Sequence, residues 1–140
     1  MPAAGDPIPP EVADKLASYS QPQRKRIESV RRLIFDQALS LENCGEVREC
    51  LKWGQISYLT EKPKSGTTIR IDVNQEGHVA LFVHCQSRLV DEIREMYPGE
   101  FELKGNREIV LDNDRPLSEK TLGHCISMAL TYHNRRRSSQ

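Results

Sequence analysis

The chain has 140 residues, a length typical of one domain, of which 37% are hydrophobic and 29% are charged. Its 20 Lys and Arg residues balance 20 Asp and Glu residues, which argues against a dedicated nucleic-acid binder and against a wholly disordered chain. There is no apolar run long enough to span a membrane and the N-terminus does not look like a signal peptide, so we expect a cytoplasmic protein with no membrane partner.

The first third of the chain favours helices. Residues 1–9 are rich in Pro, and we expect a disordered lead-in there. Pro10 suits the first turn of a short helix that ends near Ser18. A longer helix is predicted over residues 22–42, because its apolar residues recur at steps of three and four: Ile27, Val30, Ile34, Ala38 and Leu41. Its opposite face is basic and carries Arg24, Lys25, Arg31 and Arg32, so whether this helix contacts a partner stays open.

The middle of the chain favours strands. Aromatic and β-branched residues indicate extended structure near residues 52–53 and 58–60, with a bend or bulge at Gly54. Residues 67–73 alternate between apolar and polar side chains, as in a half-buried strand, and residues 78–85 form its partner after a short turn. A turn of even length pairs Val73 with His78 and puts His84 on the apolar side of the sheet with Ile69. A turn of odd length inverts this arrangement.

The last third alternates helix, hairpin and helix. Ser87 is a candidate N-cap for a helix that Pro98 ends, and residues 101–111 read as a hairpin that turns at Gly105–Asn106. A final helix begins near Ser118, with a buried stripe that runs to His133. We therefore expect one α+β domain over residues 10–134, an antiparallel sheet with helices on one face, followed by a basic flexible tail over residues 135–140.

A group of aromatic and basic side chains on the predicted sheet is our candidate ligand site. Aromatic rings with polar tips can line a small-molecule pocket, and cations at its rim can bind an anion. The candidate residues are Trp53, Tyr58, Arg70, Phe82, His84 and Arg107. The segment KSGTT at residues 64–68 lacks the spacing of a phosphate-binding P-loop, so we do not assign it that role.

The four cysteines are Cys44, Cys50, Cys85 and Cys125. In a reducing compartment we expect free thiols that act as small buried hydrophobes. His84 and Cys85 are adjacent, and neighbouring residues on a strand point to opposite faces, so they cannot form a dyad with each other. An enzyme with a site centred on Cys85 would need a contact across elements, such as Cys85 with His124.

Several blocks of the sequence resemble the YdhG-like family of bacterial domains of unknown function. They include CLKWGQISYLT, KSGTTIRID, LFVHCQSRLVDEIREMYP, GNREIVLD and LGHCISMALTYH, in the order and spacing of that family, from about Glu46 to His133. The resemblance implies a compact, frataxin-like, two-layer α+β fold. It also implies an iron-chaperone role, since some members are described as frataxin-like iron chaperones. Iron favours carboxylate oxygens, and Asp91, Glu92 and Glu95 are the candidate ligands.

These observations lead to one main functional hypothesis and two alternatives. We expect a non-enzymatic module that binds a small ligand, a metal or a protein partner on its sheet face. The first alternative is a frataxin-like intracellular iron chaperone, for which iron would be the bound metal. The second is an enzyme with a site centred on Cys85. A nucleic-acid partner is not expected, because no aromatic stacking platform accompanies the basic runs.

Overall fold

The computed structural model describes residues 8–138, with the side chains of residues 8–136. Its helices are α1 (Pro10–Ala17), α2 (Gln21–Ser40), α3 (Leu89–Met96), α4 (Glu119–Leu130) and α5 (Tyr132–Ser138). Its strands are β1 (Glu46–Lys52), β2 (Gln55–Glu61), β3 (Ile69–Val73), β4 (Val79–Phe82), β5 (Glu102–Lys104) and β6 (Glu108–Leu111). Most of the lead-in that we expected, residues 1–7, lies outside the described residues, whereas Ile8 packs against the core.

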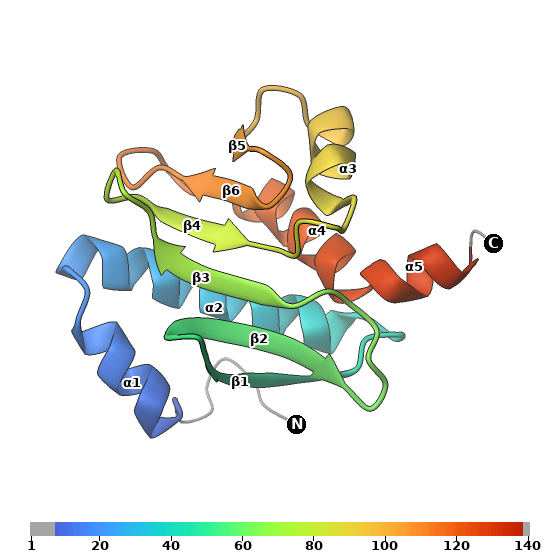
Figure 1. Cartoon of the computed structure of the whole chain (residues 1–140), viewed down its shortest axis with the longest axis horizontal. Helices are drawn as coiled ribbons and strands as arrows, with labels where there is room; N and C mark the ends of the chain where they lie inside the picture. The colour runs from blue at the N-terminus through green and yellow to red at the C-terminus, as the bar shows by residue number, and fades with distance from the viewer. Residues whose placement is uncertain (1–7, 139–140) are drawn as a thin grey trace.

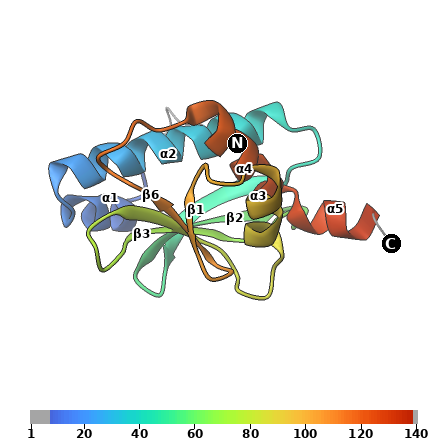
Figure 2. The ribbon, with the colours of Figure 1, turned by 90° about the horizontal axis from the view of Figure 1, so that it is seen from above.

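The strands form a six-stranded sheet in the order β1-β2-β3-β4-β6-β5, and all described neighbours are antiparallel. Figures 1 and 2 show α1, α2 and α4 on one face of this sheet, α3 at its end and α5 projecting away from it. The core lies between that helical layer and the sheet and includes Ile34, Ile71, Leu81 and Ile126. The predicted α+β class with an antiparallel sheet is confirmed. The opposite face of the sheet, which we call the open face, is turned toward the viewer in Figure 1.

Helix α2 carries a charged residue into the core. Ser20 and Gln23 form a capping box at its start. We placed Arg31 on the solvated face, but its side chain is only 7% exposed. Its guanidinium donates to both carboxylate oxygens of Glu49 on β1, at 2.7 and 3.0 Å. The prediction was wrong because an apolar stripe does not show that an arginine beside it will meet a buried carboxylate.

The same carboxylate joins a third element to this buried cluster. The Tyr58 hydroxyl, on β2, donates to Glu49 Oε2 at 2.7 Å. Burial, followed by the charge of Glu49, raises the pKa of Tyr58, so the hydroxyl stays a donor. Phe35 completes the packing, with the Arg31 guanidinium 4.9 Å from its ring centroid and the Tyr58 ring edge-on to it. The cluster of Arg31, Glu49 and Tyr58 therefore ties α2 to β1 and β2.

Strands β1 and β2 form a continuous hairpin, longer than the short extended pieces that we predicted. Its register pairs Lys52 with Gln55, so only Trp53 and Gly54 lie in the turn. Both residues have positive φ, at 56° and 75°, as a type I′ hairpin turn requires. The bend expected at Gly54 is therefore the hairpin turn itself. Trp53 is 90% exposed at its tip.

The hairpin of β3 and β4 has the odd register. Val73 pairs with Val79, and Arg70 pairs with Phe82, so the predicted pairing of Val73 with His78 was wrong. Asn74 causes the extra residue, because its backbone N–H donates to His78 O and its side chain accepts from the His78 N–H. Gly77, at φ 86°, completes this loop. In consequence the side chains of β4 lie on the faces opposite to those predicted, and Phe82 shares the open face with Arg70.

The final helix is interrupted by a loop from elsewhere in the chain. An unbroken helix would bond the N–H groups of residues 133 and 134 to the carbonyls of residues 129 and 130. Instead, Thr67 N–H donates to Ala129 O and Ser65 Oγ donates to Leu130 O. The N–H groups of His133 and Asn134 donate to Ser65 O. The β2–β3 loop is therefore inserted into the helix ladder, which ends α4 at Leu130 and starts α5 at Tyr132.

Helix α5 also replaces part of the flexible tail that we expected at residues 135–140. The structure continues the helix to Ser138. Arg135 is held by Glu92 through two hydrogen bonds of 3.0 and 3.1 Å and by a third to Met128 O. A basic run beside a helix end does not reveal that one of its arginines meets a carboxylate on another helix, and so the boundary was placed too early.

Candidate ligand-binding site

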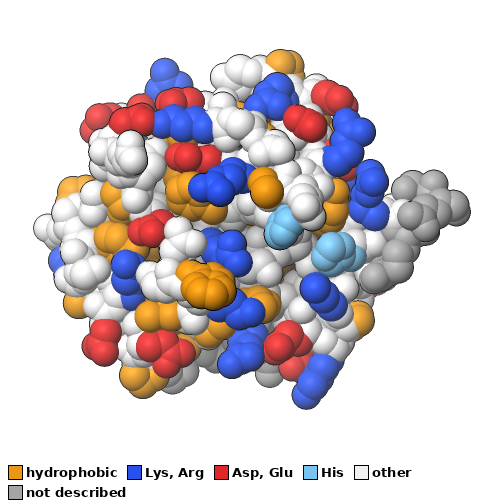
Figure 3. All heavy atoms as spheres, in the orientation of Figure 1, with side chains coloured by type: hydrophobic (Ala, Val, Ile, Leu, Met, Phe, Trp, Pro, Cys, Tyr) orange, Lys and Arg blue, Asp and Glu red, His pale blue; other side chains and the backbone are white. Residues whose placement is uncertain are grey.

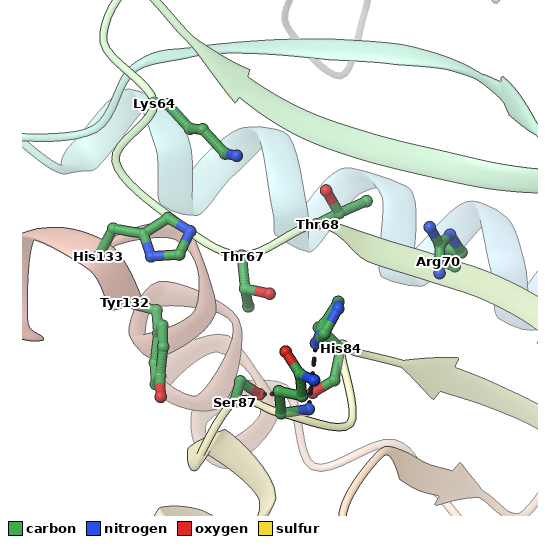
Figure 4. A pocket seen from close by; sticks show the side chains of 9 residues that line it. Lys64, Thr67, Thr68, Arg70, His84, Ser87, Tyr132 and His133 are labelled. Atoms are coloured by element: carbon green, nitrogen blue, oxygen red, sulfur yellow. Dashed lines mark hydrogen bonds between the residues drawn. The ribbon is translucent and has the colours of Figure 1, made fainter.

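A cleft of about 320 Å³ lies on the open face, where chain segments distant in sequence meet. The β2–β3 loop and β3, the β4–α3 loop and the start of α5 surround it (Figure 4). Its lining consists of Lys64, Thr67, Thr68, Arg70, His84, Gln86, Ser87, Tyr132 and His133. The volume lies at the lower end of the range for small-molecule pockets, about 300–1,000 Å³. We call this cleft the β3–α5 pocket.

The lining of the β3–α5 pocket is basic and rich in hydroxyl groups. It includes Lys64, Arg70 and two histidines, and no carboxylate side chain lines it. Figure 3 shows histidine side chains close together on this face, with lysine and arginine side chains around them. Because the whole chain is balanced at 20 positive and 20 negative residues, this composition is a local concentration of positive charge.

Arg70 has the most unusual environment of the lining residues. Among the residues that the structure describes, its guanidinium makes no hydrogen bond and no ion pair, and its Nε is covered without an acceptor. Asp72, two residues along β3, is instead bound by the Tyr19 hydroxyl at 2.7 Å and the Gln55 amide at 3.2 Å. A covered donor without an acceptor destabilises a fold by about 1–3 kcal/mol, and such groups in native structures call for a reason such as a bound ion.

The β4–α3 loop holds His84 in one orientation. The Gln86 N–H donates to His84 Nδ1 at 3.0 Å, so a neutral ring carries its proton on Nε2. Ser87, which we predicted as a helix N-cap, donates through Oγ to His84 O at 2.8 Å instead, and Arg88 is the N-cap residue. The Arg88 N–H donates to the Tyr132 hydroxyl at 2.7 Å, which ties this loop to α5.

The β2–β3 loop is fixed just as firmly. Ser65 is fully buried, and its Oγ accepts from Gly45 N–H at 2.9 Å while donating to α4. Gly66 passes so close to α4 that a Cβ on it would lie 2.2 Å from Ala129 O. Only a glycine fits there. These contacts fix the backbone that carries Lys64 and Thr68 and place His133 at the same end of the pocket as Lys64 (Figure 4).

The structure brings together some of the predicted site residues and separates others. Arg70 and His84 both line the β3–α5 pocket, and Phe82 lies on the same face, in register with Arg70. Trp53 lies at the tip of the β1–β2 hairpin, outside the lining. Tyr58 is 1% exposed in the helix-facing core, bonded to a core carboxylate.

The last of the predicted ligand residues, Arg107, is exposed in the β5–β6 turn and does not line the pocket. The predicted set was therefore split between the two faces and the two ends of the sheet. The reason is that each residue's face depends on hairpin register and turn length, which aromatic content does not reveal.

The predicted iron ligands are not arranged as a metal site. Asp91 pairs with Arg94 at 2.9 Å, Glu92 pairs with Arg135 at 3.0 Å, and Glu95 is exposed. Across residues 8–138 the structure has no group of at least three His, Cys, Asp or Glu side chains placed to hold a metal ion. Two of the candidate carboxylates are therefore compensated by arginines, so this helix does not fit the carboxylate cluster that an iron site needs.

The cysteines follow the prediction in part. All four are free, and Cys50 and Cys125 are buried. Burial raises the pKa of Cys125 to about 12 and also raises the pKa of the half-buried Cys44. Cys85, however, is exposed rather than buried. His124, its proposed partner, instead contacts the Tyr97 hydroxyl through Nδ1 at 2.5 Å.

Most of the pocket was not predicted from the sequence. Lys64, Thr67 and Thr68 belong to the segment KSGTT, which we examined only as a P-loop and set aside. That polar segment beside an alternating strand was the available signal. His133 was assigned to the stripe of an unbroken helix, and nothing in the local pattern indicates that a loop splits it. Tyr132 and Gln86 carry no local signal.

A larger cleft of about 690 Å³ beside β5 and β6 is less suited to a ligand. It mixes acidic residues, among them Glu100 and Asp112, with Arg26 and Arg115. The Arg26 guanidinium is already bonded to backbone carbonyls, those of Asp112, Asn113 and Arg115. The Arg26 guanidinium in this cleft is therefore already hydrogen-bonded within the protein, unlike Arg70 in the β3–α5 pocket.

Comparison with known proteins supports the fold. No protein-family model matches the chain, and no curated protein sequence matches it. A solved structure, that of YdhG from Bacillus subtilis, a protein of the DUF1801 family, matches with a TM-score of 0.57 at 19% identity. The match covers 83% of this chain and 85% of the other. The chain therefore has a YdhG-like α+β fold, as its sequence resemblance implied.

Among the described helices, none is both long and apolar enough to cross a bilayer.

Proposed function

We propose that this domain is a non-enzymatic binding module that holds a small molecule in the β3–α5 pocket. The observation that carries the proposal is the convergence of Arg70, His84 and Lys64 on one cleft from separate parts of the chain. Loops that are bonded to α4 and α5 form its walls, so the site is preformed. Preformed clefts with a few convergent polar groups are the usual form of ligand sites.

The same geometry gives little support to catalysis. A nucleophilic hydroxyl needs a base within hydrogen-bond reach. The proton of Ser87 Oγ is donated to a backbone carbonyl, and His84 Nδ1 accepts from a backbone N–H. Cys85 does not line the pocket. We therefore favour binding over an enzyme centred on Cys85.

An iron-chaperone role receives no specific support from the described residues. The pocket has no carboxylate in its lining, and the charges of Lys64 and Arg70 repel a metal cation. The carboxylates of α3 that could recruit iron are partly engaged with Arg94 and Arg135. A small organic ligand fits the pocket better than iron does.

The test is two-dimensional amide NMR of the labelled chain titrated with a library of small fragments that includes neutral and charged members. We expect shifts confined to residues 64–70, 84–88 and 132–134. The variant Gln86→Trp puts a bulky ring at the rim and should abolish them. The matched control Gln75→Trp adds the same ring in the exposed β3–β4 loop and should not. Shifts that survive in Gln86→Trp, or that lie elsewhere, would overturn the proposal.

A further inference from the structure

We propose that the ligand of the β3–α5 pocket carries a phosphoryl group in monoester form, and that Arg70 is its principal receptor. This inference rests on the proposed binding function and names the chemical class of the ligand. The pocket lining is positively charged. The charged side chains of the lining are Lys64 and Arg70, the histidines add positive charge when protonated, and no lining residue is acidic.

The cations of the pocket are also uncommitted. Neither Lys64 nor Arg70 forms an ion pair with any residue in the described part of the chain. The nearest acidic residue along β3, Asp72, is occupied by Tyr19 and Gln55. By contrast, Arg48 on β1 of the same sheet is paired with Glu61 at 3.8 Å. An anion entering the pocket therefore competes with no protein carboxylate for these groups.

The placement of the donors favours a phosphoryl group over a carboxylate. A carboxylate has two oxygens in one plane, and one guanidinium satisfies both. In the β3–α5 pocket Figure 4 shows Arg70 at one end and Lys64 at the other, with Thr68 and His84 between them. A phosphoryl group presents three acceptor oxygens in a tetrahedral arrangement and carries a charge of about −1.5 to −2 at pH 7. It can therefore accept from Arg70 and from a second donor beside it, and its charge offsets the positive charges of both Arg70 and the more distant Lys64.

The backbone explains why Arg70 is held in place for this role. Arg70 lies on the third of the sheet's six strands and pairs with Ser57 on one side and Phe82 on the other. Ile69 and Ile71, which directly precede and follow Arg70, are buried in the core. Because successive residues on a strand point to opposite faces, the Arg70 side chain points to the open face. The odd β3–β4 register then places His84 on the same face as Arg70. Both side chains therefore have their positions set by the pairing of β3 with β4.

The experiment compares ligands that share a ring but differ in charge: phenyl phosphate, benzoate and benzyl alcohol. Binding is measured by NMR titration for the unmodified chain, for Arg70→Met and for the matched control Arg48→Met. Phenyl phosphate should bind best, should weaken as salt is raised, and should lose about tenfold or more in affinity in Arg70→Met. Arg48→Met, which removes an arginine from the same face outside the pocket, should leave the affinity within about twofold.

Each other outcome counts against the inference in a different way. If benzoate binds as tightly as phenyl phosphate, or if Arg70→Met and Arg48→Met weaken binding equally, the phosphoryl receptor is overturned. If benzyl alcohol binds in the pocket and phenyl phosphate does not, the inference fails while the proposed binding function stands. If no member of the fragment library shifts the pocket resonances, both fail together. Thermal unfolding of both variants checks that each is folded.

Discussion

The buried cluster of Arg31, Glu49 and Tyr58 allows a quantitative test of the fold. The substitution Glu49→Leu leaves the Arg31 guanidinium, whose side chain is 7% exposed, without its carboxylate, and removes the acceptor of the Tyr58 hydroxyl. Breaking a buried pair from one side costs about 3–5 kcal/mol. For a chain of this length each kcal/mol corresponds to roughly 3–4 °C, so the midpoint of thermal unfolding should fall by about 10–20 °C.

Urea unfolding followed by circular dichroism measures this loss, and two further variants make the reasoning refutable. Replacing the whole cluster, with Arg31→Met, Glu49→Leu and Tyr58→Phe together, should recover most of the stability, because the three polar groups that bond one another are removed together. Glu61→Leu, which breaks the exposed pair with Arg48 on the same two strands, should change stability by less than about 1 kcal/mol. A loss in Glu49→Leu as small as that in Glu61→Leu would refute the argument.

Three further predictions concern other parts of the molecule. Gly66→Ala forces a Cβ to within 2.2 Å of Ala129 O and should lower the urea midpoint by the equivalent of about 1–3 kcal/mol or more; an unchanged midpoint would mean that the loop can move away from α4. Trp53→Asn should raise the thermal midpoint, since Asn tolerates the positive φ better than Trp; a lower midpoint would show that the exposed indole makes stabilising contacts. In thiol titration at pH 8, the exposed Cys85 should react first and Cys125 only after denaturation, because burial raises the pKa of Cys125 to about 12. The stabilisation of the folded state that comes from the protonated Cys125 thiol is then complete below pH 9 and is lost as the pH rises toward 12.

The local elements of this protein could largely be predicted from residue spacing. The apolar repeats of α2 and the alternation in β3 each reflect one buried face, and that periodicity is present in the sequence itself. Short turns between successive strands require antiparallel pairing, so the sheet type followed too. Arg70 could be nominated for the site because a cation on the polar side of a half-buried strand must face outward, away from the helical layer.

The three-dimensional packing of the chain, by contrast, determines which distant groups meet. The buried position of Arg31 depends on Glu49, which lies 18 residues further along the chain. The split between α4 and α5 depends on Ser65, which takes over hydrogen bonds that an uninterrupted helix would make for itself. The β3–α5 pocket exists because that inserted loop, an odd hairpin register and the start of α5 converge. Such contacts depend on charge pairing and backbone hydrogen bonds across long separations, and a periodic pattern in one segment contains no information about them.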